Sequence, residues 1–407
     1  MLADTAVVGH LGTLPLGGLA VASAALLLIY GLCFFLAYGT TATVARFTGA
    51  GEPLKASNQA IQSMWLAFFL GIAIAFFGYF AADPLLKLLG ADGELLNQAR
   101  IYLRISMFGA PAMLIMLAGV GYLRGVKDTV RPLWVAIGTA LLNLGLELVL
   151  IYGFNKEIGA SAASTVASQW VGALIYLVWI RQAIGEYKVS FKPKFLALIK
   201  LLRSSSELLL RNLSLTTSFI VATAMAARLG NVDVAAHEVG FQAWFFLAMS
   251  MDAIAIAAQA IIGNLLGAGD AHEARLMGRK AIIWSIGIGV FAGSLLAIFH
   301  IAFAGIFSED TAVVELAGFL LLHVAAMAPL SGVAFALDGI LIGAGDQRFL
   351  AKAMSLSAVI SISLMLLSVA FGLGIGWIWG SIWIFMLVRS TTLYIRFRSD
   401  KWQKLGS

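Results

Sequence analysis

The feature that most constrains this sequence is a succession of long apolar stretches. A helix needs about 20 apolar residues to cross the hydrocarbon core of a bilayer. Eleven stretches reach this length and a twelfth, at the N-terminus, is shorter. The eleven lie approximately at 17–45, 57–82, 97–123, 131–153, 159–180, 206–229, 235–263, 280–305, 315–343, 350–372 and 376–395. Since 61% of the residues are hydrophobic and 12% charged, we predict an all-α polytopic membrane protein.

Several kinds of catalytic site are missing from the sequence. The single Cys33 excludes an intrachain disulfide and a thiolate metal site. The five histidines have no HExxH spacing, and no Walker A or GxSxG motif is present. A multi-pass membrane enzyme would need His, Asp or Ser clustered at an interface, whereas the loops hold basic residues, Gly and isolated acids. We therefore expect no enzymatic activity and no cofactor.

The basic residues predict the topology. The net charge is +6, and most of the 27 Lys and Arg fall in alternate connections between the apolar stretches or after the last one. Arg389 is counted with the group that follows the last stretch. By the positive-inside rule these connections face the cytoplasm, so both ends of the complete fold are expected there.

An internal repeat with an offset of 218 residues relates the two halves of the chain. Gly49-Ala50-Gly51-Glu52 recurs as Gly267-Ala268-Gly269-Asp270. The repeat also pairs Leu11, Gly12, Pro111, Gly121, Gly125 and Asp128 with Leu229, Gly230, Pro329, Gly339, Gly343 and Asp346. An offset that spans six helices gives both halves the same orientation, related by an axis along the membrane normal. We predict two six-helix lobes related by a parallel repeat.

The repeat also predicts the domain boundaries. We place the N-terminal lobe at 1–183, a basic cytoplasmic linker at 184–205, the C-terminal lobe at 206–398 and a cytoplasmic tail at 399–407. The partner of the helix at 206 should begin about a dozen residues before Met1, by the same offset. We therefore expect the first span to be truncated, either because the start codon is assigned too late or because the chain is a fragment.

Glu147 lies in the apolar segment Leu141–Gly153, where an uncompensated carboxylate is costly. Thr139, Asn143 and Glu147 are spaced four residues apart, so they share one face of a helix. Such a stripe predicts an ion or proton pathway, or else a carboxylate that only locks two helices together.

Two further polar residues fall at a similar depth. Counted from the nearest helix end, Asp4, Glu147 and Thr165 lie about 9 to 12 Å into the membrane, and Asn143 about 15 Å. We predict that these four residues form a cation-coupling site that shares a proton or binds Na⁺ at Asp4, Asn143 and Glu147. Three unrelated helix contacts are the alternative. The neighbouring Ser161, Ser164 and Ser168 are interpreted as helix-packing residues.

The second half carries different polar residues. Asp252 and Asp338 lie within spans, and their repeat mates are Phe34 and Val120. An acid in an aromatic cavity suits a lipophilic cation. We predict a substrate cavity that contains Asp252, Asp338, Gln242 and Trp244. Arg211 is expected to extend to the cytoplasmic interface.

These motifs resemble the multidrug and toxic compound extrusion (MATE) family, DinF-like branch. The matching segments are Ala3–Gly12, Asn143–Gly153, AAHEVGFQ, Met251–Asp270 and Leu337–Asp346. The resemblance implies a twelve-helix, two-lobed exporter driven by H⁺ or Na⁺. It also implies that Asp4, Asn143, Glu147 and Thr165 form the cation site, with Glu147 where relatives commonly have Asp.

We therefore expect an antiporter in a bacterial inner membrane that exchanges small lipophilic compounds for H⁺ or Na⁺. Protonation of Asp4 and Glu147 would release a bound cationic substrate. We expect contact with membrane lipid, no nucleic acid and a monomer. The alternatives are a lipid-linked oligosaccharide flippase of the same superfamily, which would favour a basic cavity, and an inactive truncated remnant.

Overall fold

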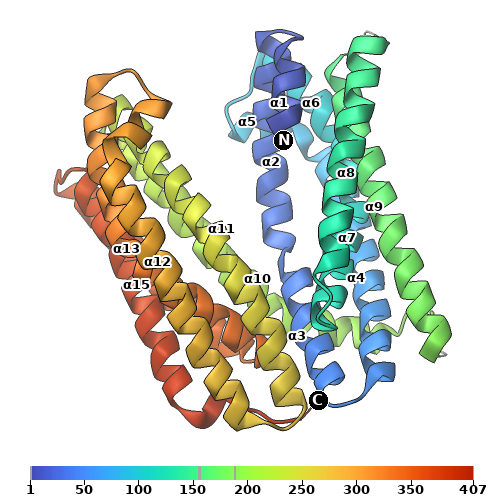
Figure 1. The fold of residues 1–407 in the computed structure, drawn as a ribbon. Helices are drawn as coiled ribbons and strands as arrows, with labels where there is room; N and C mark the ends of the chain where they lie inside the picture. Colours follow the sequence, from blue (N-terminus) through green and yellow to red (C-terminus); the bar gives the residue numbers. More distant parts are fainter. Residues whose placement is uncertain (1, 155–156, 188, 407) are drawn as a thin grey trace. The chain divides into compact units, whose positions relative to one another are not determined.

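The computed structural model describes residues 2–154, 157–187 and 189–406, and within these ranges it is built from helices without β-strands (Figure 1). The first half holds α1 (Leu2–Gly9), α2 (Thr13–Cys33), α3 (Phe35–Gly49), α4 (Pro53–Phe80), α5 (Ala82–Leu88), α6 (Gly93–Met107), α7 (Ala110–Gly125), α8 (Val130–Leu148), the π-helix η1 (Val149–Gly153) and α9 (Ile158–Tyr187). The second half holds α10 (Phe195–Leu229), α11 (Asn231–Gly267), α12 (Ala271–Phe307), α13 (Thr311–Gly343), α14 (Gln347–Ala370), α15 (Ile375–Arg398) and the 3-10 helix η2 (Asp400–Trp402).

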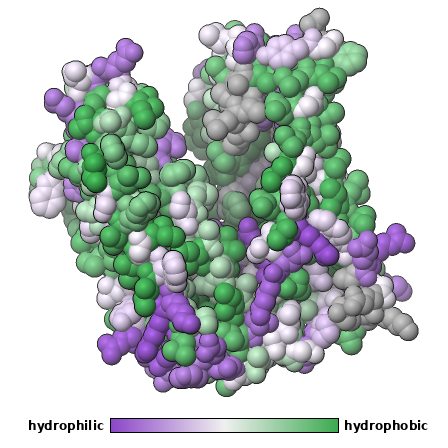
Figure 2. Space-filling model, in the orientation of Figure 1, coloured by the Kyte–Doolittle hydropathy of each residue, from purple (hydrophilic) through white to green (hydrophobic). Residues whose placement is uncertain are grey.

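Among the described residues, ten helices are long and apolar enough to cross a membrane, or 11 if one bent pair is counted as a single span. The all-α polytopic fold predicted from the apolar stretches is therefore confirmed. In each unit, hydrophobic residues cover much of the visible helix sides and hydrophilic residues gather near the helix ends (Figure 2). This distribution matches a protein whose sides contact acyl chains.

The chain divides into two compact units. The N-terminal unit comprises residues up to Thr48 and Glu52–Ser205, and the C-terminal unit comprises Gly49–Gly51 and the residues from Ser206 onward. The division falls inside α10. The expected linker 184–205 is helical at both ends, since α9 continues to Tyr187 and α10 begins at Phe195.

The helix boundaries repeat with the offset found in the sequence. The span Thr13–Gly49 corresponds to α11, Asn231–Gly267, and the pair α6 and α7 corresponds to α13. Both boundaries of each pair are separated by the same 218 residues. These two spans therefore match their repeat mates in length and position.

The repeated glycines make the same close helix contact in both units. A Cβ atom on Gly121 would lie 2.7 Å from the carbonyl oxygen of Ala37, and one on Gly339 would lie 2.1 Å from the carbonyl oxygen of Ala255. Ala37 and Ala255 are themselves repeat mates. The small residues therefore bring α7 against α3, and α13 against α11, at backbone distance.

The predicted span 97–123 is divided in the structure. α6 and α7 meet at an angle of 52°. Gly109 lies at the break and Pro111 lacks the N–H that would continue the hydrogen-bond ladder. The equivalent α13 contains Pro329 yet is unbroken, and it has Met327 where the first half has Gly109. Glycine lowers helix stability by about 1 kcal/mol relative to alanine, which accounts for the break in only one half.

Side chains of α4 hold the segment that leads to α10. The Gln62 side chain accepts a hydrogen bond from the backbone N–H of Lys194 at 2.7 Å and donates one to the carbonyl of Lys192 at 3.2 Å. The indole N–H of Trp65 donates to the carbonyl of Phe191 at 2.8 Å. Gln62 is 1% exposed, so this polar contact is part of the packed N-terminal unit.

Candidate cation-coupling site

The N-terminal unit surrounds its polar residues with an apolar cluster drawn from α1, α2, α6, η1 and α9. Asp4 lies on α1, Asn143 and Glu147 on α8, and Thr165 on α9. α1 packs against α2, α8 and α9, and α8 packs against α9 (Figure 1). The helices that carry the four predicted residues are therefore neighbours in one unit.

Glu147 is fully buried at the end of α8. The hydroxyl of Ser161 on α9 donates a hydrogen bond to its Oε1 atom. Within the described part of the chain, Oε2 has no hydrogen-bond partner. Burial of a carboxylate without full hydrogen bonding is costly. The geometry therefore leaves one carboxylate oxygen available to a proton or a cation.

A π-helical turn, η1, follows Glu147 directly. Such turns insert an extra residue into an α-helix, are rare, and occur frequently at functional sites. Ile151 of η1 is buried in the same apolar cluster, and the Tyr152 ring lies 6.2 Å from that of His10. The helix thus changes its winding immediately after the buried acid.

Asn143 and Thr165 are in direct contact. The Asn143 amide donates to the Thr165 hydroxyl at 3.0 Å. Both side chains are partly buried. Because Asn143 uses its N–H group here, its carbonyl oxygen remains an acceptor that can face a proton donor or a cation.

Asp4 is 7% exposed and interacts electrostatically with both Glu147 and Tyr102. Tyr102 on α6 is 3% exposed and lies near Thr165 and Ser161 as well as the two acids. The structure therefore brings the four predicted polar residues close together, with Ser161 and Tyr102 beside them.

The sequence pattern does not predict a role for Ser161 and Tyr102 at this site. Ser161 was interpreted as a packing residue, yet its hydroxyl binds Glu147. Its position four residues before Thr165, on the same helix face, is a signal that points to it. Tyr102 has no comparable signal, since an aromatic residue inside a span is ordinarily a packing residue. Thr139 lies on the predicted stripe but its hydroxyl bonds to the carbonyl of Val135, 2.7 Å away.

The C-terminal unit contains a buried charge cluster centred on Asp338 of α13. Arg211 of α10 and Arg389 of α15 both donate to its Oδ2 atom. Asp338 is 2% exposed, Arg211 is 7% exposed and Arg389 is fully buried. Arg389 also lies over the Phe335 ring, 5.0 Å from its centroid. One carboxylate thus joins three helices.

Arg211 and Arg389 both lie in places that differ from the sequence-based expectation. Arg211 does not extend to the interface, because it binds Asp338 and the side-chain oxygen of Asn212 at 2.7 Å. Arg389 does not follow the last span, because α15 continues to Arg398 and encloses it. In both cases the buried carboxylate of Asp338 compensates a positive charge that would be energetically costly inside the membrane.

The other residues of the predicted substrate cavity lie in different surroundings. Asp252 is half-buried on α11 and interacts electrostatically with Arg389. Gln242 is exposed and donates to the Glu238 carboxylate at 2.7 Å. Trp244 belongs to the apolar core, with its ring 4.4 Å from that of Phe219.

Known proteins can be aligned with this sequence over its whole length. The profile of the MatE family matches residues 1–149 and 208–367. Protein DETOXIFICATION 44, chloroplastic, of Arabidopsis thaliana is 31% identical over 426 residues, which cover 100% of this chain and 80% of that protein. DNA damage-inducible protein F of Escherichia coli (strain K12) is 30% identical, over 96% of this chain and 86% of that protein.

The solved structures share the fold. A crystal structure of MATE in the bent conformation superposes with a TM-score of 0.90 at 23% sequence identity, over 98% of this chain and 90% of that one. The profile match and the relatives show the family, and the superposition shows the same helical architecture. The chain is a multi-pass membrane protein that belongs to the MatE family, the multidrug and toxic compound extrusion transporters.

Proposed function

We propose that this protein is a secondary active antiporter that exports lipophilic, often cationic compounds in exchange for H⁺ or Na⁺ by alternating access. The observation that supports this best is the buried Glu147, which has one oxygen bound by Ser161 and the other unpartnered among the described residues. An ionisable residue in such a place is typical of an ion or proton pathway. A relative from Thermotoga maritima, 25% identical over 99% of this chain, is called a probable multidrug resistance protein NorM.

In this mechanism Asp4, Asn143, Glu147 and Thr165 form the coupling site. Protonation of both Asp4 and Glu147 removes their charge, whereas one Na⁺ bound between them offsets one of the two charges. Either event changes how α1 and α8 pack in the N-terminal unit. Asn143 and Thr165 supply oxygen atoms beside the two acids, and Ser161 orients Glu147. The exchange of ion for substrate requires that each binds the two transport states with different affinity.

For the substrate we propose Asp252 as the acid that attracts a cationic compound, with Gln242 and Trp244 as neighbouring cavity residues. Asp338 was predicted for the same cavity. Its carboxylate is already bound by Arg211 and Arg389, so we assign it the role of holding α10, α13 and α15 together.

We place the protein in a bacterial inner membrane, where both termini of the full-length fold lie in the cytoplasm, as a monomer that contacts lipid and binds no nucleic acid. The flippase alternative requires cations that face an open cavity. The buried Arg211 and Arg389 are instead bound to Asp338, and the antiporter is therefore preferred.

The test is transport in proteoliposomes with ethidium as the probe, under a pH gradient and a Na⁺ gradient separately. We expect one gradient to drive ethidium uptake, and Asp4→Asn and Glu147→Gln each to abolish it. Glu157→Gln, which removes an exposed carboxylate just before α9, is the matched control. Coupled transport that survives both site variants would overturn the proposal.

A further inference from the structure

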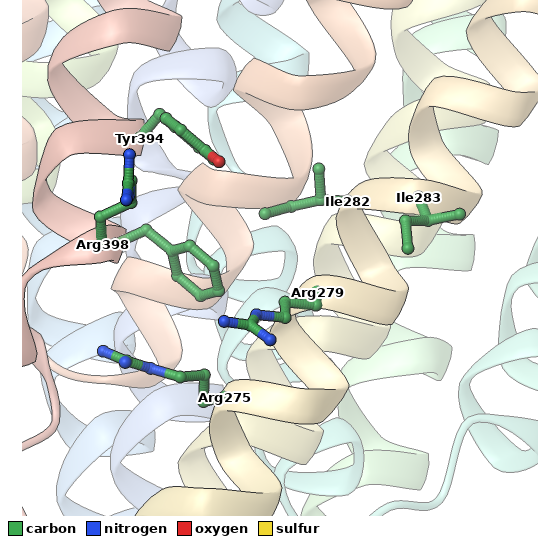
Figure 3. A pocket seen from close by; sticks show the side chains of 7 residues that line it. Arg275, Arg279, Ile282, Ile283, Tyr394 and Arg398 are labelled. Carbon is green, nitrogen blue, oxygen red and sulfur yellow. The ribbon is translucent and has the colours of Figure 1, made fainter.

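A basic pocket lies between α12 and α15 of the C-terminal unit (Figure 3). Both helices pack against α13, and the pocket of about 600 Å³ opens where α12 begins and α15 ends. Arg275, Arg279 and Arg398 line it together with Tyr394 and Phe397. Figure 3 shows Arg275 and Arg279 pointing from α12 towards α15.

The pocket carries an excess of positive charge. Arg275 is bound to the carboxylate of Asp400. Within residues 2–154, 157–187 and 189–406, neither Arg279 nor Arg398 has a salt-bridge partner. Guanidinium groups bind phosphate by charge-assisted, bidentate hydrogen bonds. The site therefore suits a phosphate-bearing anion.

The floor of the pocket is held in place by ring packing. A Cβ atom on Gly278 would lie 2.8 Å from the Phe397 ring, so this glycine makes room for the ring against α12. The Phe397 ring stacks on Trp402 with centroids 5.3 Å apart, and the Trp402 indole donates to the Phe397 carbonyl at 2.8 Å. Trp402 is fully buried. The arginines therefore surround a rigid pair of aromatic side chains, Phe397 and Trp402.

An apolar groove continues from the basic pocket along α12. It has a volume of about 390 Å³ and shares Ile283 with the pocket. Trp284, Gly287 and Phe291 line its length. No heavy atom lies within 4 Å of where a Cβ atom on Gly287 would be, so the groove is open at this point. Residues 283 to 291 extend about 12 Å along the helix.

We propose that the pocket and the groove together bind one anionic phospholipid. The phosphate lies among Arg275, Arg279 and Arg398, and an acyl chain follows the groove from Ile283 to Phe291. Basic pockets between transmembrane helices bind anionic lipid headgroups elsewhere. The groove distinguishes a phospholipid from a free phosphate, because only the lipid covers the apolar surface beside the arginines.

Native mass spectrometry of the purified full chain, mixed with phosphatidylglycerol or phosphatidylcholine, tests the proposal. We expect phosphatidylglycerol to be retained about tenfold more. The double variant Arg279→Gln/Arg398→Gln should lower its retention to that of phosphatidylcholine. The matched control is Lys280→Gln/Lys401→Gln, which removes the same charge from two exposed residues outside the pocket lining and should retain the lipid as the unmodified protein does.

Two further variants test the groove without a change of charge. Gly287→Leu should fill it and lower phosphatidylglycerol retention. Gly380→Leu fills an apolar groove without arginines elsewhere on the same unit and should have no effect. If the arginine variant does not fold, the effect of Gly287→Leu on phosphatidylglycerol retention still tests the proposal. Equal retention by the arginine and lysine variants, or displacement of the lipid by an equal concentration of inorganic phosphate, would overturn the proposal.

Discussion

Arg389 on α15 donates a hydrogen bond to the carboxylate of Asp338 on α13, inside the C-terminal unit where solvent barely reaches either side chain. Arg211 on α10 binds the same carboxylate oxygen. Helices surrounded by acyl chains gain little from hydrophobic burial and depend on packing and polar contacts for their association. This charge cluster is therefore a main contact among three helices of the unit.

Replacement of Asp338 alone should destabilise the protein more than replacement of Asp338 together with Arg389. Asp338→Leu removes the carboxylate that two buried guanidinium groups share, which costs about 3–5 kcal/mol of unfolding free energy. Asp338→Leu/Arg389→Met removes one of them and should recover part of that loss. Thermal unfolding in detergent measures both. Arg348→Met, which removes an exposed ion pair with Glu207, should cost at most about 1 kcal/mol, and an equal effect at Asp338 would contradict this interpretation.

Loss of the Ser161 hydroxyl should impair coupled transport without unfolding the protein. A hydrogen bond to a charged group contributes about 1.5–3 kcal/mol, so Ser161→Ala should slow ethidium exchange about tenfold or more. The initial rate in proteoliposomes measures the effect. Ser164→Ala is the control, because the Ser164 hydroxyl bonds only to the carbonyl of Ser161 at 2.8 Å among the contacts described for it. Rates that fall equally in both variants would argue against a specific role for Ser161.

Side chains added at the repeated glycines should destabilise both units. Gly121→Leu and Gly339→Leu place atoms where the backbones of Ala37 and Ala255 lie. Overpacking of this kind costs about 1–3 kcal/mol. Thermal unfolding and expression level report the loss. Gly138→Leu, on α8 with no heavy atom within 4 Å of its Cβ position, should leave both nearly unchanged.

The contacts of Gln62 should protect the segment that leads into α10. Gln62→Leu removes both hydrogen bonds to the backbone of Lys192 and Lys194. Trypsin should then cleave after Lys194 about three to ten times faster, since local opening governs proteolysis. The bond after Lys192 precedes Pro193 and resists trypsin in either protein. Gln242→Leu, which removes only an exposed contact with Glu238, should leave the rate unchanged. Unaltered cleavage in the Gln62 variant would show that other contacts hold the segment.

The spans, their repeat and the polar stripe on α8 were predictable because each depends on the spacing of apolar and polar residues along the chain. An apolar stretch of sufficient length has few structural alternatives in a membrane. The offset of 218 residues correctly located equivalent helix ends such as Gly49 and Gly267. The four-residue spacing of Asn143 and Glu147 placed them on one helix face.

The tertiary structure alone decided which side chains meet the buried charges. Nothing near Asp338 in the sequence points to Arg211, 127 residues away, or to Arg389, 51 residues away. The rotation and axial shift of packed helices determine such contacts, and each depends on the packing of the whole unit. The same reasoning applies to Tyr102, which lies near Thr165 only because α6 packs against α9. Local spacing therefore determined the helices, and packing determined the partners of their charges.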